Sequence, residues 1–536
     1  MKNKMIFVRI MLMIIIAAIT YYIFLPAFNF HSFGFYVYIL FVVGVYKILS
    51  IIKFENKILK IQKSSKNNKI LLKENIVYIS FVIIFALIFI VNFVYSPIFF
   101  SKKYAKRIII DETSTFVDDI KAVNYNALPL LDKDSSEKLG DRVMGQMSEL
   151  VSQFEVSTLY TQINYNNDII RVTPLEYASF IKWITNKKEG VKGYITVNSV
   201  SGESELYKLD KGMKYMPSAY FNDNLYRKLR FEYPTKIFGR ISFEIDNDGS
   251  PYWIIPTISY SAVELLKEVN GLIILDPVSG NSNLYKIEDV PEWVDQVFDA
   301  SLIIEQVNDW GLYKNGFLNS LFGQKGVVQT TEGYNYTIQD DDVFMYTGIT
   351  SINSDESNIG FILTNLRTKE TKFYAVPGAE EYSAMESAKG QVQQMNYVSS
   401  FPLLINLNSR PTYLISLKDA AGLVKMYAFV DVEDYQKVVV TDSSLGIKEA
   451  SRLYLKNINF KNNDSSSFIK KEITISSINI AMIDGTTYFY IKDLSGQKYK
   501  VSIKVNENLL PFITKGNKLK INYLTEEDII DIISID

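Results

Sequence analysis

Three long apolar stretches occupy the first hundred residues of the chain. They span residues 5–28, 34–52 and 76–100, and they contain only two charged side chains, Arg9 and Lys47. Each stretch has about the twenty residues that a helix needs to cross a hydrocarbon core of roughly 30 Å. The pattern therefore predicts three transmembrane helices within residues 1–100. The first stretch is too long for a signal-peptide core, and no small-x-small cleavage motif follows it.

Lysines between these stretches predict their orientation. The loop 53–75 carries seven lysines, whereas the link 29–33 carries none. Because positively charged loops stay in the cytoplasm, we expect the N-terminus and loop 53–75 to be cytoplasmic and residues 101–536 to be extracytoplasmic. Four cations behind the third stretch argue the other way, namely Lys102, Lys103, Lys106 and Arg107. A cytoplasmic location of residues 101–536 stays open as an alternative.

A segment of sixteen residues occurs three times in the polar part of the chain. It reads GYITVNSVSGESELYK from Gly193, GLIILDPVSGNSNLYK from Gly271 and GFILTNLRTKETKFYA from Gly360. Each copy has an apolar strand, a turn opened by Asn or Asp, and a second strand that ends in Tyr, which predicts a β-hairpin. Lys369 replaces the turn glycine of the other copies, so we expect a different turn there. A looser fourth copy begins at Met426.

Strands precede three of these four hairpins, and helices are expected to follow them. Strands are predicted from Ser250, Gly333 and Arg410, and helices from Pro217, Pro291 and Gly378, with Pro291 at a first helical turn. We expect tandem hairpin-plus-helix modules of the α+β class, the first two within residues 191–345 and a third and possible fourth within 346–445. Residues 101–190 are predicted to form a membrane-proximal α/β domain with helices at 135–154 and 173–185, the second capped by Thr173.

The C-terminal region changes in composition. Residues 446–467 end in a polar cluster and are interpreted as a linker, and residues 468–536 are rich in strand-forming side chains. Strands are expected at 472–482, 486–492, 496–505, 517–524 and 528–535, with a short helix within 506–516 and turns at Asp484-Gly485 and Ser495-Gly496. Three strands, a helix and two strands resemble the order of an OB-fold, a small β-barrel.

Two further resemblances follow from these motifs. The strand, hairpin and helix within residues 190–440 resemble the PepSY-type module of bacterial envelope proteins. The runs PYWIIP, PEWVDQVF, GYNY and GAEEYSAMESAKGQVQ resemble a group of poorly characterised multi-span membrane proteins of Gram-positive bacteria, some labelled as cell-shape proteins. The resemblance implies a role in the cell envelope and supplies no catalytic residues.

Composition narrows the chemistry that the chain can perform. It has no cysteine and a single histidine, His31, which lies between the first two apolar stretches. Residues 101–536 therefore contain no Ser-His-Asp triad, no thiol nucleophile and no HExxH zinc motif. The net charge of −2 gives no electrostatic reason to expect nucleic acid as a partner. Carboxylate chemistry, Ser-Lys chemistry and oxygen-ligated cations remain.

Several polar clusters contain residues that could form a catalytic or metal-binding site, and we interpret them as structural. Asp340, Asp341 and Asp342 are interpreted as a solvated loop, because adjacent side chains of an extended chain point in opposite directions. Asp246–Gly249 is interpreted as a hairpin turn rather than a calcium loop. Glu380, Glu381 and Glu386 do not share one helix face and are interpreted as solvated charges, and Ser135–Lys138 as a chance S-x-x-K match.

The sequence thus predicts a membrane-anchored α+β protein without catalytic, cofactor-binding or metal-binding residues. We expect a non-enzymatic, extracytoplasmic scaffold or interaction protein of the bacterial envelope. Its partners would be the lipid bilayer and an envelope protein or wall polymer. Aromatic side chains such as Tyr334 and Tyr336 suit such binding, and core packing explains them at least as well. Two alternatives remain open: an envelope hydrolase that uses Asp or Glu, and a membrane protein whose cytoplasmic part binds protein or nucleic acid.

Overall fold

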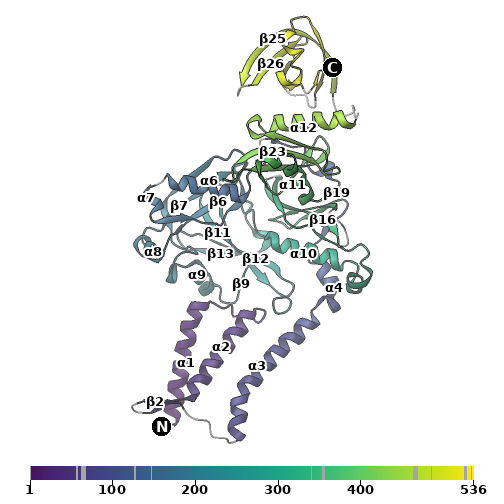
Figure 1. The fold of residues 1–536 in the computed structure, drawn as a ribbon. Helices are drawn as coiled ribbons and strands as arrows, with labels where there is room; N and C mark the ends of the chain where they lie inside the picture. The colour runs from purple at the N-terminus through teal and green to yellow at the C-terminus, as the bar shows by residue number, and fades with distance from the viewer. Residues whose placement is uncertain are drawn as a thin grey trace. The chain divides into compact units, whose positions relative to one another are not determined.

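The chain is a mixed α+β protein with N-terminal apolar helices, several small antiparallel sheets and a C-terminal sheet curled into a half-barrel (Figure 1). The computed structural model describes residues 2–55, 58–61, 68–125, 128–146, 148–339, 341–352, 357–462, 469–483, 486–523, 528–532 and 534–535. Two compact units divide the chain. Unit 1 comprises Met1–Thr113 and Ala127–Tyr374, and unit 2 comprises Ser114–Asn126 and Ala375–Asp536.

Each of the three apolar stretches forms a helix. These helices are α1 (Lys2–Phe24), α2 (Phe33–Ile51) and α3 (Asn68–Val94). Within the described residues, Phe7–Phe24 of α1 is long and apolar enough to cross a membrane, and a second such span results when α3 and α4 (Pro97–Ala105) are counted together across a bend of 56°. Within α2, the apolar stretch Phe33–Leu49 is shorter than that requirement. One or two candidate spans therefore stand where three were expected.

The bend between α3 and α4 corrects the expected third span, which was drawn through to residue 100. Proline has no N–H to donate and disfavours helical geometry in the residue before it. Ser96, which precedes Pro97, accordingly takes extended angles (φ −68°, ψ 163°). In the lysine loop, β1 (Ile52–Glu55) pairs with β2 (Ile58–Ile61). Its lysines Lys57, Lys63 and Lys66 lie outside the described residues.

Four antiparallel sheets repeat one topology. In each, a long central strand pairs on one side with two short strands and on the other side with a hairpin. The first sheet contains β4 (Phe154–Val156), β5 (Thr161–Tyr165), β6 (Asp168–Tyr177), β7 (Val191–Asn198) and β8 (Ser204–Met213). The second contains β9 (Ile237–Phe238), β10 (Ser242–Ile245), β11 (Pro251–Ser259), β12 (Glu268–Leu275) and β13 (Ser282–Tyr285).

The third and fourth sheets follow the same plan. The third contains β14 (Val328–Thr330), β15 (Asn335–Gln339), β16 (Asp342–Ser351), β17 (Ser357–Asn365) and β18 (Thr371–Tyr374), and β3 (Ile110–Asp111) pairs parallel with β18. The fourth contains β20 (Val398–Ser399), β21 (Leu403–Leu407), β22 (Arg410–Lys418), β23 (Val424–Asp431) and β24 (Val438–Asp442). The predicted hairpins from Gly193, Gly271, Gly360 and Met426 are all confirmed.

A shared bulge supports the fourth copy of the repeat. In the second, third and fourth sheets, the register between central strand and hairpin skips one residue directly before the repeat begins. The skipped residues are Asn270, Ile359 and Lys425. Because a bulge bends its strand at a defined point, the same bulge in three sheets gives them the same local shape.

The repeated hairpin turn is built by local hydrogen bonds. The side chains of Asn198, Asp276 and Asn365 accept from the backbone N–H two residues on, at 2.9, 2.8 and 2.8 Å. The turn then needs a left-handed residue, which is Gly202 (φ 76°), Gly280 (φ 78°) or Lys369 (φ 67°). The expectation of a different third turn is therefore wrong. Lys369 adopts the glycine conformation while its ammonium bonds to the Arg107 carbonyl (2.8 Å) and to Glu268 (3.1 Å).

The first and the fifteenth position of the repeat meet across the hairpin. A Cβ atom on Gly193, Gly271 or Gly360 would lie 2.7, 2.9 or 2.2 Å from the carbonyl oxygen of Tyr207, Tyr285 or Tyr374. Such distances are far shorter than a normal contact, so a side chain at the first position forces the two strands apart. Close backbone approach thus explains why glycine opens these three copies.

Sheet two is buried on both faces. Trp253, Ile255 and Ile273 belong to a core that it shares with sheet one. Ile254, Leu272 and Ile274 belong to a second core, which it shares with sheet three and α10 (Ala300–Tyr313). Successive residues of a strand point to opposite faces, so burial of both faces accounts for the uninterrupted apolar run in β11.

Two expected helices begin later than predicted. Thr173 and Pro174 lie in strand β6, where they pair with Ile195 and Tyr194, and the helix α8 (Phe180–Asn186) begins later with Ser179 as its cap. Helix α10 begins after Asp299 rather than at Pro291. The residues between Pro291 and the start of α10 are held by tertiary hydrogen bonds. The backbone N–H groups of Asp295 and Gln296 donate to the Glu244 carboxylate. Those of Val297 and Phe298 donate to the Leu366 carbonyl.

The remaining helices mostly precede the sheet that they contact. α6 (Lys133–Gly145) contacts β7 and β8, α10 contacts β14, and α11 (Glu381–Gly390) contacts β22 and β23. The first predicted helix of residues 135–154 ends earlier, with α7 (Ser148–Val151) and β4 behind it. Other short elements are α5 (Phe116–Asp119), α9 (Leu225–Glu232) and β19 (Gly378–Ala379). A helix laid on the preceding hairpin is seen in unit 2, where α12 (Ile447–Asn462) contacts β23 and β24 in a region that was expected to be a linker.

The C-terminal sheet curls around its own core. It contains β25 (Ile469–Ile483), β26 (Thr486–Asp493), β27 (Lys498–Ser502), β28 (Lys518–Tyr523), β29 (Ile529–Asp531) and β30 (Ser534–Ile535). The consecutive strands β29 and β30 pair with β27 and β28, at opposite ends of the sheet. The expected helix is only a 3₁₀ turn, Leu510–Phe512. Where a linker was expected at 446–467, α12 occupies 447–462; residues 463–468 and the Asp484-Gly485 turn lie outside the described residues.

Gly360→Ala tests the close approach of the hairpin strands. The added Cβ would meet the Tyr374 carbonyl at 2.2 Å, so we expect the change to cost about 1–3 kcal/mol of stability. Gly390→Ala is the matched control, because no atom lies within 4 Å of its Cβ position. Thermal unfolding of the detergent-solubilised chain measures both variants. Equal melting temperatures for the two would contradict the close-approach explanation.

Candidate functional site

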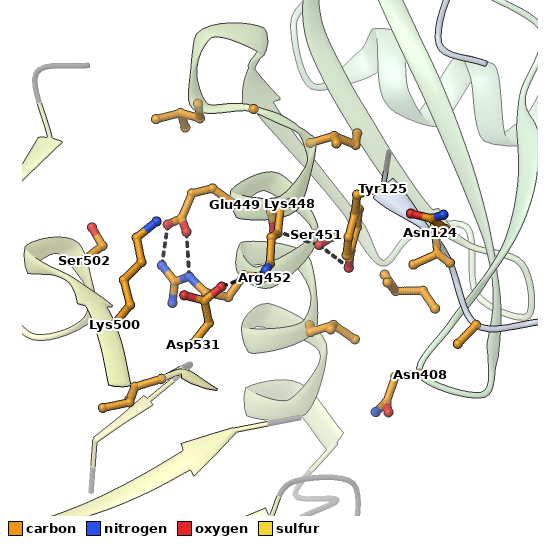
Figure 2. A pocket seen from close by; sticks show the side chains of 18 of the residues that line it. Asn124, Tyr125, Asn408, Lys448, Glu449, Ser451, Arg452, Lys500, Ser502 and Asp531 are labelled. Atoms are coloured by element: carbon orange, nitrogen blue, oxygen red, sulfur yellow. Dashed lines mark hydrogen bonds and ion pairs between the residues drawn. The ribbon is translucent and has the colours of Figure 1, made fainter. Parts of the chain in front are cut away.

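A cavity of about 690 Å³ lies within unit 2, between α12, the half-barrel strands β26, β27 and β29, and residues 122–125 (Figure 2). Residues 122–125 reach this place because they bond to the fourth sheet. The Val123 N–H donates to the Asn406 carbonyl at 2.9 Å, and the Asn406 amide donates to the Ile120 carbonyl at 2.6 Å. The Ser451 hydroxyl of α12 lies 2.7 Å from the Tyr125 hydroxyl, which brings both hydroxyls to the cavity wall.

Oppositely charged side chains line the cavity in pairs. On α12, Arg452 donates to both carboxylate oxygens of Glu449, at 2.9 and 2.5 Å. Lys448 lies 3.1 Å from Asp531, which connects α12 to the half-barrel. Residues three and four positions apart share a helix face, so one turn of α12 supplies all three of its charged groups. Bidentate pairing holds the Arg452 guanidinium in a defined orientation.

An aromatic ring completes the wall on the half-barrel side. The Lys500 ammonium lies 4.4 Å from the centre of the Tyr488 ring. Burial raises the pKa of Tyr488, and the nearby carboxylates of Glu449 and Asp531 raise it further while Arg452 lowers it. These influences show that the ring and the ion pairs share one environment. Tyr488 therefore stays a neutral phenol that can both stack and donate a hydrogen bond.

The cavity can bind a polar ligand by several contacts at once. Its lining combines two amides, three hydroxyls, the ion pairs and the Tyr488 ring; the amides and hydroxyls belong to Asn124, Asn408, Tyr125, Ser451 and Ser502. Amides and hydroxyls both donate and accept, and an aromatic face packs against the apolar face of a sugar ring. Across the described parts of the chain, no three His, Cys, Asp or Glu side chains gather as metal ligands would.

The acidic residues weighed in the sequence have structural roles elsewhere. Asp342 is not solvated as expected: its carboxylate binds Arg367 at 2.8 and 2.7 Å, because the third hairpin turn packs beside β16. The Asp341 carboxylate accepts from Asn164 at 3.3 Å, and Asp340 lies outside the described residues. Asp246 and Gly249 form the predicted hairpin turn, in which Asp246 accepts from the Asp248 and Ser250 N–H groups.

The helix residues and aromatics considered as candidate sites also have structural roles. Glu381 is fully buried in α11 and was wrongly expected to be solvated, whereas Glu386 pairs with Lys389 at the surface. Ser135 and Ser136 are buried at the start of α6, where Asp132 caps the helix. Tyr334 and Tyr336 pack against the core of sheets two and three rather than forming an exposed strip.

The cavity residues were missed because the sequence places them in three separate regions. Lys448, Glu449 and Arg452 fall in the expected linker, Tyr488 and Asp531 in the half-barrel, and residues 122–125 in the expected membrane-proximal domain. The one available signal was the helical spacing of charged residues 448–452, which a linker interpretation leaves unused.

Two carboxyl groups are buried together in unit 1, away from this cavity. Glu244 of β10 accepts from the backbone N–H groups of Asp295 (2.9 Å) and Gln296 (3.3 Å), and Asp295 accepts from the Asn164 N–H (2.7 Å). Burial raises the pKa of Glu244 to about 7, against the lowering effect of these hydrogen bonds. Burial and the charge of Glu244 raise the pKa of Asp295 well above its usual value. Both groups are closed off from solvent, and we assign them to the joint between the sheets.

No protein-family model, no curated protein and no solved structure matches this chain.

Asp295→Asn tests the buried carboxyl pair. Both folded-state pKa values lie above the ordinary values, so the folded chain retains protons that the unfolded chain releases above pH 4.5. Stability is therefore fully present at lower pH and falls as pH rises towards about 7. Replacing Asp295 removes the repulsion on Glu244 and keeps an acceptor for the Asn164 N–H. We expect the free energy of unfolding to fall less between pH 5 and pH 7 than in the unchanged chain, by about 1.4 kcal/mol for each unit by which a folded-state pKa returns towards its ordinary value. Melting temperatures at the two pH values measure this difference.

The control for this experiment is Asp248→Asn, which neutralises an exposed turn carboxylate. Its pH dependence should match that of the unchanged chain. Part of the dependence will persist in Asp295→Asn, because burial also raises the pKa of Asp309 to about 6. An identical pH profile for Asp295→Asn and Asp248→Asn would contradict coupling between Glu244 and Asp295.

Proposed function

We propose that this chain is a multi-pass membrane protein of the bacterial envelope, whose extracytoplasmic sheets hold a pocket that binds a hydroxyl-rich wall polymer. The observation that carries the proposal is the outward-facing apolar surface of α1–α3. Phe7 and Phe24 of α1 are 67% exposed and Phe89 of α3 is 71% exposed. Water disfavours apolar surface on this scale, whereas a bilayer matches it.

The end of α1 is hydrogen-bonded to α9 and the residues after it, within unit 1. Arg227 and Arg230 of the α9 region donate to the carbonyls of Tyr22 and Leu25, each at 3.0 Å, and the Phe28 N–H donates to the Pro234 carbonyl at 2.8 Å. The last carbonyls of a helix have no partner within it and carry partial negative charge, which the guanidinium groups offset. These contacts favour the interpretation of α1 as a permanent anchor over that of a cleaved signal sequence.

The other helix ends support three spans in the proposed orientation. The His31 carbonyl accepts from the Glu264 N–H at 3.1 Å, and the Asn92 side chain of α3 bonds to both backbone groups of Val263. The link to α2 and the end of α3 thus both meet residues 263–264, whereas the end of α1 meets α9 and the Pro234 carbonyl. This arrangement favours a topology in which the N-terminus and the lysine loop lie on the side of the membrane opposite to residues 101–536.

The structure also weakens the charge evidence against this orientation. Arg107 is 8% exposed and binds the Glu268 and Glu305 carboxylates, and the Lys103 ammonium bonds to the Ser261 hydroxyl at 2.8 Å. A cation that is neutralised within the folded protein is a weaker orientation signal than a free one. We therefore retain residues 101–536 as extracytoplasmic.

Binding of a wall polymer is supported by the cavity of unit 2. Its hydroxyls, amides, ion pairs and Tyr488 ring suit a ligand with many hydroxyl groups. The repeated sheets and the curled C-terminal sheet are consistent with the PepSY-like modules and OB-like barrel that the sequence resembles. We propose that these modules are binding elements, and that the cavity is one of their ligand sites.

Cysteine labelling on intact cells tests the location. The chain has no cysteine, so Ser64→Cys, Ser201→Cys and Ser495→Cys give single sites for a membrane-impermeant maleimide. We expect labelling at positions 201 and 495 and none at 64 until the cells are opened. The opposite pattern would place residues 101–536 in the cytoplasm and favour the alternative of a cytoplasmic protein- or nucleic-acid-binding region.

Tyr488→Ala tests the ligand. Soluble fragments of wall glycan are titrated into the detergent-solubilised chain, and loss of stacking should weaken binding by about 1 kcal/mol, roughly fivefold. Tyr490→Ala is the control, because Tyr490 lies on the same face of β26 but outside the cavity lining. Equal affinities for the two variants would exclude this cavity as the glycan site. Release of new glycan ends that Glu449→Gln abolishes would instead favour the hydrolase alternative.

A further inference from the structure

Two exposed apolar patches lie on unit 1 near the helix ends. The first, the α8 patch, consists of Phe180, Ile181 and Ile184 of α8 together with Phe221, and Ile181 is 62% exposed. The second, the 318–322 patch, consists of Leu318, Leu321 and Phe322, and Phe322 is 83% exposed. Clusters of large apolar side chains at a surface mark contact with another apolar phase or partner.

The α8 patch is rigidly supported from below. The Trp183 ring is buried, and its centre lies 5.7 Å from both the Phe180 and the Phe221 ring. The cap of α8 is also fixed, because the Ser179 hydroxyl accepts from the Lys182 N–H. The patch is therefore held in shape by the folded protein, and its rings are not free to turn inward.

Direct contacts connect the α8 patch to the end of α1. Asn222, next to Phe221, accepts a hydrogen bond from the Tyr22 hydroxyl at 2.9 Å. The Arg227 guanidinium lies 4.1 Å from the centre of the Tyr22 ring and donates to the Phe221 carbonyl. Tyr22 belongs to the last turn of α1, so the patch begins where the apolar helix ends.

A similar chain of contacts connects the 318–322 patch to the end of α3. Tyr313 of α10 packs against Tyr104 of α4 with ring centres 5.7 Å apart, and the Tyr104 hydroxyl donates to the Tyr95 carbonyl at 3.1 Å. Tyr313 also lies against Phe317, which leads into the patch. The two patches thus lie near the points where α1 and α3 meet the other elements of unit 1.

Exposed lysines border both patches. Lys187 and Lys188 follow α8, and Lys314 and Lys325 precede and follow the 318–322 patch. Apolar side chains ringed by lysine are the composition of a surface that rests in the headgroup region of an anionic bilayer. Each lysine near such a surface contributes about 1 kcal/mol.

We propose that the α8 patch and the 318–322 patch insert into the headgroup–acyl boundary of the same bilayer that α1 crosses. The proposal rests on the membrane anchoring proposed above. Contacts on both sides of the helix ends hold unit 1 against the membrane surface and set its tilt. Continuity with α1 and α3 and the bordering lysines favour the bilayer over a protein as the occupant of these patches.

Lipid quenching of a fluorophore in the full chain tests the proposal. Phe221→Cys and Phe322→Cys, each the only cysteine of its chain, are labelled with the environment-sensitive fluorophore NBD and reconstituted into vesicles of neutral and anionic phospholipid. A nitroxide placed just below the headgroup of the lipid serves as quencher. We expect each label to emit at shorter wavelength and to lose about half of its fluorescence when nitroxide lipid is present. Omitting the anionic lipid should reduce this quenching.

Two control positions make the outcomes distinct. Ser201→Cys lies at the far end of β7 from α8, and the eight residues of β7 separate them by about 26 Å, so its label should not be quenched. Ile14→Cys lies within α1 and reports the anchor itself. Quenching at Ile14 with none at positions 221 and 322 would overturn the proposal and leave the anchor intact. In that case, protection of positions 221 and 322 from maleimide in cells would assign the patches to a protein partner. Absence of quenching at Ile14 would overturn the anchor and the proposal together.

Discussion

A buried arginine after α4 joins the apolar helices to the second sheet of unit 1 and to α10. Arg107 stands between α4 and β3, its side chain is 3% exposed, and it binds Glu268 of β12 and the Glu305 and Asp309 carboxylates of α10. Removing it would leave Asp309, whose side chain is 15% exposed, without this cation, and breaking a largely buried ion pair in this way costs several kcal/mol, whereas Glu268 would keep its pairing with Lys369. The segment after α4 is thereby bonded to both the second sheet and α10.

Other charged side chains of unit 1 also bond to distant elements. Glu244 accepts from the backbone N–H groups before α10, Asp342 binds Arg367 in the third hairpin turn, and Lys369 connects that turn to Arg107. Glu244 and Lys369 thereby connect different elements of unit 1, whereas Asp342 acts within the third sheet. The charged groups around the unit 2 cavity differ, because Lys448, Glu449 and Arg452 line an open space of about 690 Å³ rather than a packed joint.

Repetition gives the sheets a common backbone but leaves their surfaces independent. Glycine at the first position and Asn or Asp at the sixth recur because a hairpin of this shape needs them. Side chains that point away from the shared core are under no such constraint. The polar cavity of unit 2 is one example, because its lining comes from residues outside the repeated hairpin.

Local patterns in the sequence determined the apolar helices, the hairpins and most strands of the half-barrel, because each depends on contacts within about ten residues. The turn at Asn198 is one example, since its side chain bonds two residues on. Tertiary structure alone decided the late start of α10, the strand at Thr173 and the left-handed Lys369, since Glu244, Ile195 and Arg107 lie far away in sequence. The cavity was unpredictable for the same reason. Its walls come from three distant segments, and only folding brings Tyr125 to Ser451.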